Sequence, residues 1–267
     1  MNENKPLIEL ISLAGKTAVI TGAAAGMGEA TARRFAESGA NLYLLDIDEA
    51  GVTAVAHSLA HFPVRITPHT LDLSQKSEID TFWDSLTEGE EPDIIVNNAG
   101  IFPFRDFLET DEALLQKVTD INFTAVYWMC QHFIRQRKES KQSGVIVNVS
   151  SIEAHLPFKE DLAHYTTGKA AVIALTRALA RDYGRIGIRA NVILPGGVIT
   201  QGTKSAAKQA WKSPGLIKDG LNFKARLPLG RMGQPDEVAR VTLILASDLT
   251  SYMTGAAIPV DGGFLSA

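Results

Sequence analysis

The stretch Lys16-Thr-Ala-Val-Ile-Thr21-Gly22-Ala-Ala-Ala-Gly26-Met-Gly28 decides the fold of this chain. Its first six residues are rich in β-formers and predict a short strand, and a helical pattern follows from Glu29 to Glu37. Glycines between a strand and a helix let backbone N–H groups approach a phosphate, and a helix N-terminus favours negative charge. The stretch therefore predicts a binding site for the pyrophosphate of a dinucleotide.

An acidic residue follows the second predicted strand. Residues 41–45 read Asn-Leu-Tyr-Leu-Leu, and Asp46 comes 24 residues after Gly22. A carboxylate at this distance can accept hydrogen bonds from the adenosine ribose, and it would repel a 2′-phosphate. Neither Ala25 nor Ile47 supplies a cation to offset that repulsion. Asp46 therefore favours NAD over NADP, and a plain surface turn is the alternative interpretation.

Alternating strand and helix patterns continue to the end of the chain. The further strand patterns cover residues 64–71, 93–97, 145–149, 188–194 and 256–260. Pro68 lies in the first of these, and because proline donates no ladder hydrogen bond it suits an edge strand. We predict an α/β fold with a single domain over residues 13–267, after an N-terminal extension of residues 1–12. The predicted architecture is a Rossmann-like, doubly wound parallel sheet of about seven strands in the order 3-2-1-4-5-6-7, with helices on both faces.

The longest helical pattern begins at Thr110 or Asp111 and runs to about Phe133. Asn122 lies inside it, although asparagine is a poor helix-interior residue that competes for backbone hydrogen bonds. We interpret Asn122 as a functional kink. Residues 135–143 are charged and predict a solvated connector to the next strand.

Residues 200–229 lack a clear strand period and predict a mobile lid. The segment is basic although the chain as a whole is acidic. Its cations are Lys204, Lys208, Lys212, Lys218, Lys224 and Arg226, and its one acid is Asp219. Two interpretations remain open: cations that favour an anionic substrate, or an amphipathic helix whose lysines share one solvated face.

The residues from Ser150 to Lys169 predict an active site. Ser151 follows the strand pattern that ends at Val149, so it lies at the carboxyl edge of the sheet, where open α/β sheets bind ligands. Tyr165 and Lys169 are four residues apart at the start of a helix, so the phenol and the ammonium lie on one helix face. A phenol beside a fixed cation is a candidate acid.

Composition narrows the partners. The formal charge of −4 and the pI of about 5.9 give no general attraction to nucleic acid or to an anionic membrane. The single cysteine, Cys130, cannot close an intrachain disulfide, and no apolar run approaches the length of a membrane span. We find no cluster of Cys or His with metal-ligand spacing and expect no metal. These features predict a cytoplasmic, soluble protein.

Taken together, the motifs resemble the classical short-chain dehydrogenase/reductase family over about Leu13 to Gly263. The motifs are Thr21-Gly22-x-x-x-Gly26-x-Gly28, Asp72-Leu73, Asn97-Asn98-Ala99-Gly100, Asn122, Ser151, Tyr165-x-x-x-Lys169 and Pro195-Gly196-x-Val198-x-Thr200. One departure is the spacing from Ser151 to Tyr165, which is one residue longer than is common in the family.

The resemblance implies roles for these residues. Asn122, Ser151, Tyr165 and Lys169 match the catalytic tetrad, with Tyr165 as acid/base and both Tyr165 and Lys169 against the cofactor. The remaining cofactor contacts it implies are Gly22, Gly26, Met27 and Gly28 at the pyrophosphate, Asp46 at the ribose, Asp72, Leu73, Asn98, Ala99 and Gly100 around the adenine, and Pro195, Gly196, Val198 and Thr200 near the nicotinamide.

These observations predict an enzyme that interconverts a secondary alcohol and a ketone with NAD(H). One alternative is an NADP-linked 3-oxoacyl-carrier-protein reductase, against which Asp46 argues. Another is a dinucleotide-binding redox sensor without turnover, against which the complete tetrad argues. The family resemblance, with apolar residues on more than one face of the helices around Asn122 and Tyr165, also predicts a homotetramer.

Overall fold

The computed structural model describes residues 5–87, 89–203, 222–223 and 225–267. These residues form a sheet in which every pair of neighbouring strands is parallel, in the order β3-β2-β1-β4-β5-β6-β7. The strands are β1 (Thr17–Thr21), β2 (Asn41–Asp46), β3 (Ile66–Thr70), β4 (Ile94–Asn97), β5 (Gly144–Val149), β6 (Ile188–Pro195) and β7 (Ala257–Val260). The predicted fold class and strand order are confirmed.

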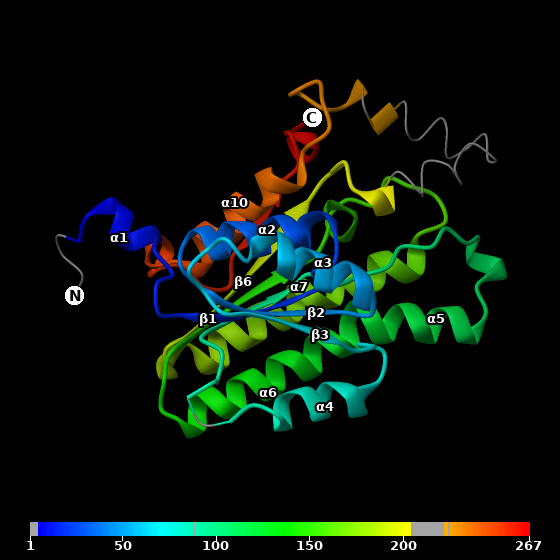
Figure 1. Cartoon of the computed structure of the whole chain (residues 1–267). Helices are drawn as coiled ribbons and strands as arrows, with labels where there is room; N and C mark the ends of the chain where they lie inside the picture. Colours follow the sequence, from blue (N-terminus) through cyan, green and yellow to red (C-terminus); the bar gives the residue numbers. More distant parts are fainter. Residues whose placement is uncertain (1–4, 88, 204–221, 224) are drawn as a thin grey trace.

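Helices cover both faces of the sheet (Figure 1). One face carries α2 (Gly26–Glu37), α3 (Glu49–Leu59) and α10 (Pro235–Ala246), and the other carries α4 (Lys76–Asp84), α6 (Ala125–Glu139) and α7 (Ala163–Tyr183). Successive strand residues point to opposite faces, so Ile20 joins the core beneath α2 and Val19 joins the core beneath α6. Burial on both faces explains why the strands read as continuous apolar runs.

The edge position of β3 agrees with its proline. β3 pairs with β2 alone, and Pro68 lies opposite Leu44 in the register. Proline has no backbone N–H, so in an edge strand it removes no hydrogen bond between strands inside the sheet. The prediction that this strand is an edge is confirmed.

The long helical pattern is built from three segments: α5 (Glu112–Thr119), a π-helical turn (Asp120–Thr124) and α6. The predicted charged connector over 135–143 is wrong in its first half, because α6 continues to Glu139. The cause is Arg137, which is 5% exposed and donates from Nε to the Ser143 carbonyl at 2.8 Å and from Nη2 to Asp93 at 3.3 Å. The guanidinium therefore ties the end of the helix to the sheet.

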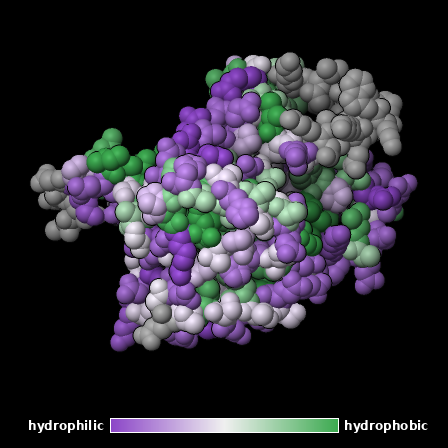
Figure 2. All heavy atoms as spheres, in the orientation of Figure 1, coloured by the Kyte–Doolittle hydropathy of each residue, from purple (hydrophilic) through white to green (hydrophobic). Residues whose placement is uncertain are grey.

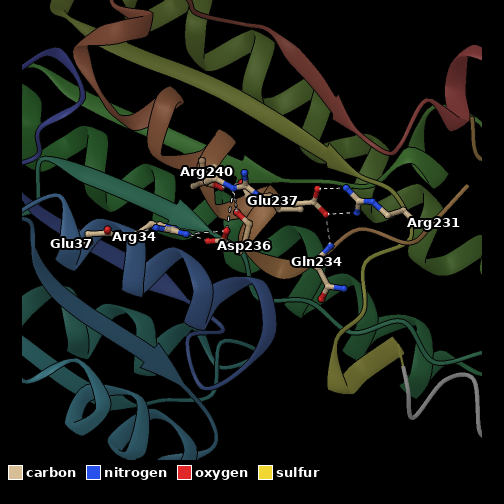
Figure 3. Close-up of polar contacts among 9 residues, drawn as sticks. Arg34, Glu37, Arg231, Gln234, Asp236, Glu237 and Arg240 are labelled. Carbon is tan, nitrogen blue, oxygen red and sulfur yellow. Dashed lines mark hydrogen bonds and ion pairs between the residues drawn. The ribbon is translucent and has the colours of Figure 1, made fainter. Parts of the chain in front are cut away.

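Two ion-pair groups fasten α10 to its surroundings (Figure 3). Arg34 of α2 makes a bidentate contact with Asp236 of α10, at 2.6 and 3.0 Å. Arg231 makes a similar contact with Glu237 at 2.7 and 2.8 Å, and Glu237 also accepts the backbone N–H of Gln234. Such forked pairs are geometrically specific. The Arg34 pair holds α10 against α2, the helix that begins at the glycine turn, and the Arg231 pair ties α10 to the segment before it.

Near its N-terminus the chain forms the short helix α1 (Leu7–Ile11), which lies beside residues 248–250 and is joined to them by a Lys5–Asp248 ion pair of 3.5 Å. Leu7 and Ile8 are exposed, and Figure 2 shows hydrophobic atoms gathered over α1. No helix in the described ranges has the length and apolar character needed to cross a membrane.

The predicted lid falls mostly outside the described residues. Positions 204–221 and 224 are not described, and they include Lys204, Lys208, Lys212, Lys218, Asp219 and Lys224. Arg226 is described, and its Nε donates to the Ala267 carbonyl at 2.9 Å while its guanidinium lies 4.7 Å from the ring centroid of Phe264. Arg226 therefore anchors the end of the chain.

Candidate active site

The residues predicted to bind or react lie where the parallel strands end. β1 ends at Thr21, β2 at Asp46, β4 at Asn97, β5 at Val149 and β6 at Pro195. Because all strands run the same way, their carboxyl ends form one edge of the sheet. The strand order also puts β1 between β2 and β4, so the chain leaves β1 at the point where the order reverses.

The glycine turn connects β1 to α2. Gly22 and Gly26 have φ values of +65° and +62°, which glycine adopts without strain. A Cβ at Gly28 would collide with the Gly22 carbonyl oxygen and would lie 2.7 Å from the Asn98 side chain, so only glycine permits this approach. α2 begins at Gly26 after Ala25, whose methyl side chain cannot cap it. The free N–H groups of the first turn fit a bound pyrophosphate.

Asp46 is held beside this turn. Its Oδ2 accepts the Ala24 N–H at 2.9 Å and its Oδ1 accepts the Asp48 N–H at 3.0 Å. Asp48 is in turn the N-cap of α3 and accepts the Gly51 N–H at 3.0 Å. Two backbone donors thus fix a half-buried carboxylate at the end of β2. The arrangement suits recognition of a ribose next to the pyrophosphate.

Thr21 and Asn98 fasten the turn after β4 to the glycine turn. Thr21 Oγ1 accepts the N–H groups of Asn98 and Ala99, at 3.0 and 3.1 Å. The Asn98 side chain donates to the carbonyls of Thr21 and Gly22, at 2.9 and 3.1 Å. Asn98 therefore shapes the predicted cofactor site with its side chain. Sequence reasoning did not give Thr21 a role; the hydroxyl at the end of β1 was the available signal.

The predicted adenine pair lies beside Asp46. The Leu71 N–H donates to the Asp46 carbonyl at 3.0 Å, which brings the end of β3 to the end of β2. Asp72 accepts the Ser74 N–H at 2.9 Å through its side chain, and Leu73 packs against the core. The pair thus forms a rigid turn next to the predicted ribose site.

Asn122 sits in the π-helical turn and is 0% exposed. Its Oδ1 accepts the Ile101 N–H at 3.0 Å, and its Nδ2 donates to the Ile101 carbonyl at 2.8 Å. π-bulges often mark functional sites. A Cβ at Gly100 would lie 2.8 Å from Asn122 Oδ1 and 3.1 Å from Lys169 Nζ. Gly100 therefore leaves the space in which these two polar groups approach each other.

Ser151, Tyr165 and Lys169 meet at the end of β5. Lys169 is 3% exposed, its Nζ donates to the Val149 carbonyl at 2.9 Å, and its Nζ lies 6.0 Å from the centroid of the Tyr165 ring. Ser150 Oγ donates to the Lys169 carbonyl at 2.7 Å. A hydrogen bond from Ser151 acts on the Tyr165 phenol. The strand end and the first turns of α7 thus hold the three predicted catalytic side chains together.

Burial sets the proton affinities of the pair. It raises the pKa of Tyr165 to about 12, partly offset by the Ser151 hydrogen bond and reinforced by the charge of Glu153. It lowers the pKa of Lys169 to about 8, because the ammonium is removed from water. The proposed chemistry leads us to expect that Lys169 and the cationic nicotinamide of NAD+ together lower the pKa of Tyr165. In the chain without a cofactor, burial raises the pKa of Tyr165.

The loop before Tyr165 is fastened to the loop after β4. His164 Nε2 lies 2.8 Å from the Pro103 carbonyl, so this ring nitrogen is the donor, and the Phe102 and Tyr165 rings meet edge to face at 6.0 Å. Arg105 N–H donates to the carbonyl of Asp161, which has a φ of +64°. Asp161, with this left-handed backbone conformation, lies in the loop between Ser151 and Tyr165, which is one residue longer than is common in the family. Sequence reasoning missed His164 and Phe102.

The end of β6 approaches the glycine turn. Pro195 pairs with Val260, and the Gly196 N–H donates to the Val260 carbonyl at 3.0 Å. Thr203 links the predicted nicotinamide contacts, because its Oγ1 donates to the Val198 carbonyl at 2.9 Å and its N–H donates to Thr200 Oγ1 at 3.1 Å. A Cβ at Gly26 would lie 3.3 Å from Thr200 Cγ2. The predicted cofactor contacts therefore surround one edge of the sheet.

The sequence and the fold are similar to those of known proteins. Residues 22–265 match the sequence model of a family described as Enoyl-(Acyl carrier protein) reductase. The L-rhamnose 1-dehydrogenase (NAD(P)(+)) of Azotobacter vinelandii is 34% identical over 94% of this chain and 97% of its own length. The chain belongs to the short-chain dehydrogenase/reductase family. A galactitol 2-dehydrogenase (L-tagatose-forming) of Cereibacter sphaeroides is 36% identical over 94% of this chain and 96% of its own.

Other relatives are named for different substrates. A 3-oxoacyl-[acyl-carrier-protein] reductase of Chlamydia pneumoniae is 34% identical over 95% of this chain and 98% of its own length. A solved structure of a putative NAD(P) dependent gluconate 5-dehydrogenase from Beutenbergia cavernae, with bound NADP, superimposes with a TM-score of 0.89 at 30% identity, over 97% of this chain and 100% of that one. The chain is an oxidoreductase of this family, and its relatives use NAD(P).

Proposed function

We propose that this enzyme interconverts a secondary alcohol and a ketone by NAD(H)-linked hydride transfer, with Tyr165 as the acid/base. The observation that carries the proposal is the grouping of the Tyr165 phenol with the buried Lys169 ammonium and the Ser151 hydroxyl at the end of β5. A general acid must lie within hydrogen-bond reach of the oxygen it protonates. Lys169 of this group lies next to Gly100, one of the predicted cofactor contacts.

Each side chain has a distinct task. Tyr165 gives a proton to the carbonyl oxygen in reduction and takes it from the alcohol in oxidation. Ser151 donates a hydrogen bond to the same oxygen as charge develops on it. Lys169 supplies a fixed positive charge beside the phenol and would donate a hydrogen bond to the nicotinamide ribose of a bound cofactor. Asn122, which holds the Ile101 backbone, orders the path by which the proton reaches solvent. The bound nicotinamide supplies the hydride chemistry.

The half-buried phenol needs help to work near neutrality. Its pKa, raised to about 12 in the chain alone, must fall before the phenolate can act as a base near neutral pH. The Lys169 ammonium lies 6.0 Å from the ring centroid and provides part of this decrease, provided that it stays protonated. The positively charged nicotinamide of NAD+ would stabilise the phenolate form of Tyr165. The phenolate is the form that takes the proton from the alcohol, so this charge favours the oxidation direction.

We propose NAD as the preferred cofactor. Asp46 supports this choice, because two backbone N–H groups hold its carboxylate at the end of β2 and prevent it from swinging away from a ribose. A 2′-phosphate there would meet a fixed negative charge. The residues proposed to hold the cofactor are Gly22, Gly26, Met27, Gly28, Asp46, Asp72, Leu73, Asn98, Ala99, Gly100, Tyr165, Lys169, Pro195, Gly196, Val198 and Thr200.

We propose a neutral sugar or polyol as the substrate. Relatives named for rhamnose and galactitol support this class, and a relative named for a 3-oxoacyl carrier protein substrate supports the main alternative. The test is a panel of sugars, polyols, steroids and acyl thioesters with NAD(H) and NADP(H). Turnover of polyols with NAD is expected. Turnover of acyl thioesters alone would support the reductase alternative, and no turnover of any compound would support a redox sensor.

Further proposals concern the setting of this site. We propose that residues 13–267 act as one catalytic domain after the extension 1–12. We also propose a reducing, cytoplasmic location, which is consistent with a single buried cysteine that accepts a hydrogen bond from Asn97 in the core. Detection of the protein by cell fractionation would test the location.

A further inference from the structure

The loop between Ser151 and Tyr165 carries a buried carboxylate to which the proposed reaction assigns no task. Glu153 is 4% exposed. Its backbone N–H donates to Ser151 Oγ at 3.1 Å, and its Oε2 accepts the Phe158 N–H at 3.1 Å. Glutamate is rarely buried to this degree, because removing its charge from water is costly. A buried acid next to a catalytic hydroxyl therefore calls for a functional explanation.

Phe158, whose backbone N–H donates to the Glu153 carboxylate, belongs to an aromatic cluster. Phe158 stacks on Phe223 with ring centroids 5.1 Å apart and meets Phe264 at 4.6 Å. The Phe223 and Phe264 rings are 4.7 Å apart, so the three rings form one cluster beside the loop. Apolar rings lower the local dielectric and let a charge act over several ångströms. The charge of Glu153 does reach the phenol, because it contributes to the raised pKa of Tyr165.

Two lysines, one in the same loop and one in α7, carry the opposite charge. Lys169 Nζ is buried and donates to the Val149 carbonyl, and Lys159 Nζ lies 5.6 Å from the Phe158 ring and 6.0 Å from the Phe104 ring. The charges of Lys169 and Lys159 are the same in the native enzyme and in a variant that differs only at residue 153. Their effect on substrate binding therefore cancels when the two proteins are compared. The field of Glu153 itself can therefore be isolated by an isosteric substitution.

We propose that Glu153 determines specificity by charge: its buried carboxylate disfavours substrates that carry a carboxylate near the reacting carbon and favours neutral polyhydroxylated ones. A substrate oxygen bound to Ser151 and Tyr165 lies close to residue 153, because the backbone N–H of Glu153 donates to Ser151 Oγ and the Glu153 side chain is buried in the same loop. A second negative charge in that space is repelled, whereas a neutral polyhydroxylated compound meets no such repulsion. The inference rests on the proposed acid/base role of Tyr165 and argues against the anionic substrate that the basic 204–226 segment suggested.

The test is Glu153→Gln with pairs of compounds that differ in charge. Glutamine keeps an acceptor for the Phe158 N–H and removes the charge, so the loop is preserved. One pair is a hexitol and the corresponding aldonate, assayed with NAD; the other is ethyl 3-oxobutanoate and 3-oxobutanoate, assayed with NADH. The variant should raise the ratio of kcat/KM for the acid to kcat/KM for the neutral compound by at least about tenfold, as expected for removing a unit charge several ångströms away in a low-dielectric site.

The control is Glu160→Gln, which makes the same change of charge at an exposed position of the same loop. It should leave the ratio within about twofold. If Glu153→Gln also leaves the ratio within twofold, or lowers kcat/KM equally for acid and neutral compound, Glu153 does not select by charge. If neither the native enzyme nor Glu153→Gln used hexitols, only the proposed substrate class would be contradicted. The ratio of kcat/KM for 3-oxobutanoate to kcat/KM for its ethyl ester would still test the role of Glu153.

Discussion

Asn122 and Ile101 hold each other by two hydrogen bonds, from the Ile101 N–H to Asn122 Oδ1 at 3.0 Å and from Asn122 Nδ2 to the Ile101 carbonyl at 2.8 Å. One side chain thereby satisfies the backbone of the residue that follows Gly100. The helix accommodates this contact with a π-helical turn, which turns Asn122 inward. The contact sets the position of Gly100 relative to Lys169.

We predict that Gly100→Ala lowers kcat/KM by at least about tenfold, about 1.4 kcal/mol. The new methyl group would lie 2.8 Å from Asn122 Oδ1 and 3.1 Å from Lys169 Nζ, so one of these groups must move. The measurement is steady-state kinetics beside the melting temperature. Gly184→Ala is the control, since a methyl group there would meet no described atom within 4 Å. Equal activity of the two variants would show that the space at Gly100 is unimportant.

The cofactor proposal predicts that the native enzyme prefers NAD to NADP by at least about 2 kcal/mol in kcat/KM, roughly 30-fold. Asp46→Ala should narrow this preference, because it removes the fixed charge that a 2′-phosphate would meet. Asp48→Ala is a comparison variant that removes a neighbouring acid which caps α3. Equal or better use of NADP by the native enzyme would refute the proposal.

Lys169 predicts a dependence of stability on pH. Its pKa is lowered from 10.5 to about 8, so between these values the unfolded chain binds the proton and the folded chain does not. The free energy of unfolding therefore rises with pH in this window, and the destabilisation by the buried charge is fully present below pH 8. Relative to Lys169→Met, the native protein should gain about 2 kcal/mol between pH 7.5 and 9.5.

Chemical denaturation of both proteins at several pH values measures this gain. The native protein and Lys169→Met both contain Tyr165, so the titration of Tyr165 largely cancels in the difference between their free energies of unfolding. Lys138→Met, which removes an exposed lysine, controls for the change in net charge. A constant difference between native protein and Lys169→Met over this range would mean that Lys169 is not destabilised by burial.

The fold was predictable because its signals are local. A strand, a glycine turn and a helix in succession indicate a Rossmann-like sheet, and Pro68 agrees with the edge position that this fold gives the third strand. Asn122 was recognisable as a misfit in a helical pattern, and it lies in the π-helical turn. The end of α6 was not predictable in this way. Arg137 looks like a surface residue until the fold brings Asp93 and the Ser143 carbonyl to it.

The parts of the site that sequence reasoning missed depend on contacts between distant segments. Thr21 acquires its role from Asn98 across the sheet, and His164 from Pro103 in another loop. The raised pKa of Tyr165 also comes from burial, which spacing along a helix does not reveal. The spacing of residues along the sequence identifies which side chains can meet. Their pKa values depend on how far the folded chain removes them from water.

The quaternary prediction is a homotetramer. Leu115 of α5 and Tyr127 of α6 are 48% and 42% exposed on the helices around Asn122, and a partner subunit would cover them. Light scattering at micromolar concentration should give four times the chain mass of 28.8 kDa. Leu115→Glu combined with Tyr127→Glu should shift the mass downward. A monomer mass for the native protein would rule the assembly out.

The central claim is that Tyr165 transfers the proton, and Tyr165→Phe tests it most directly. Phenylalanine keeps the ring that packs against Phe102 and removes only the hydroxyl. We expect turnover to fall by at least about a thousandfold, within the range that general acid–base catalysis supplies. NADH binding, followed by fluorescence titration, should stay within a few-fold of the native value. If the variant kept more than about a tenth of native turnover, the acid/base role of Tyr165 would be wrong.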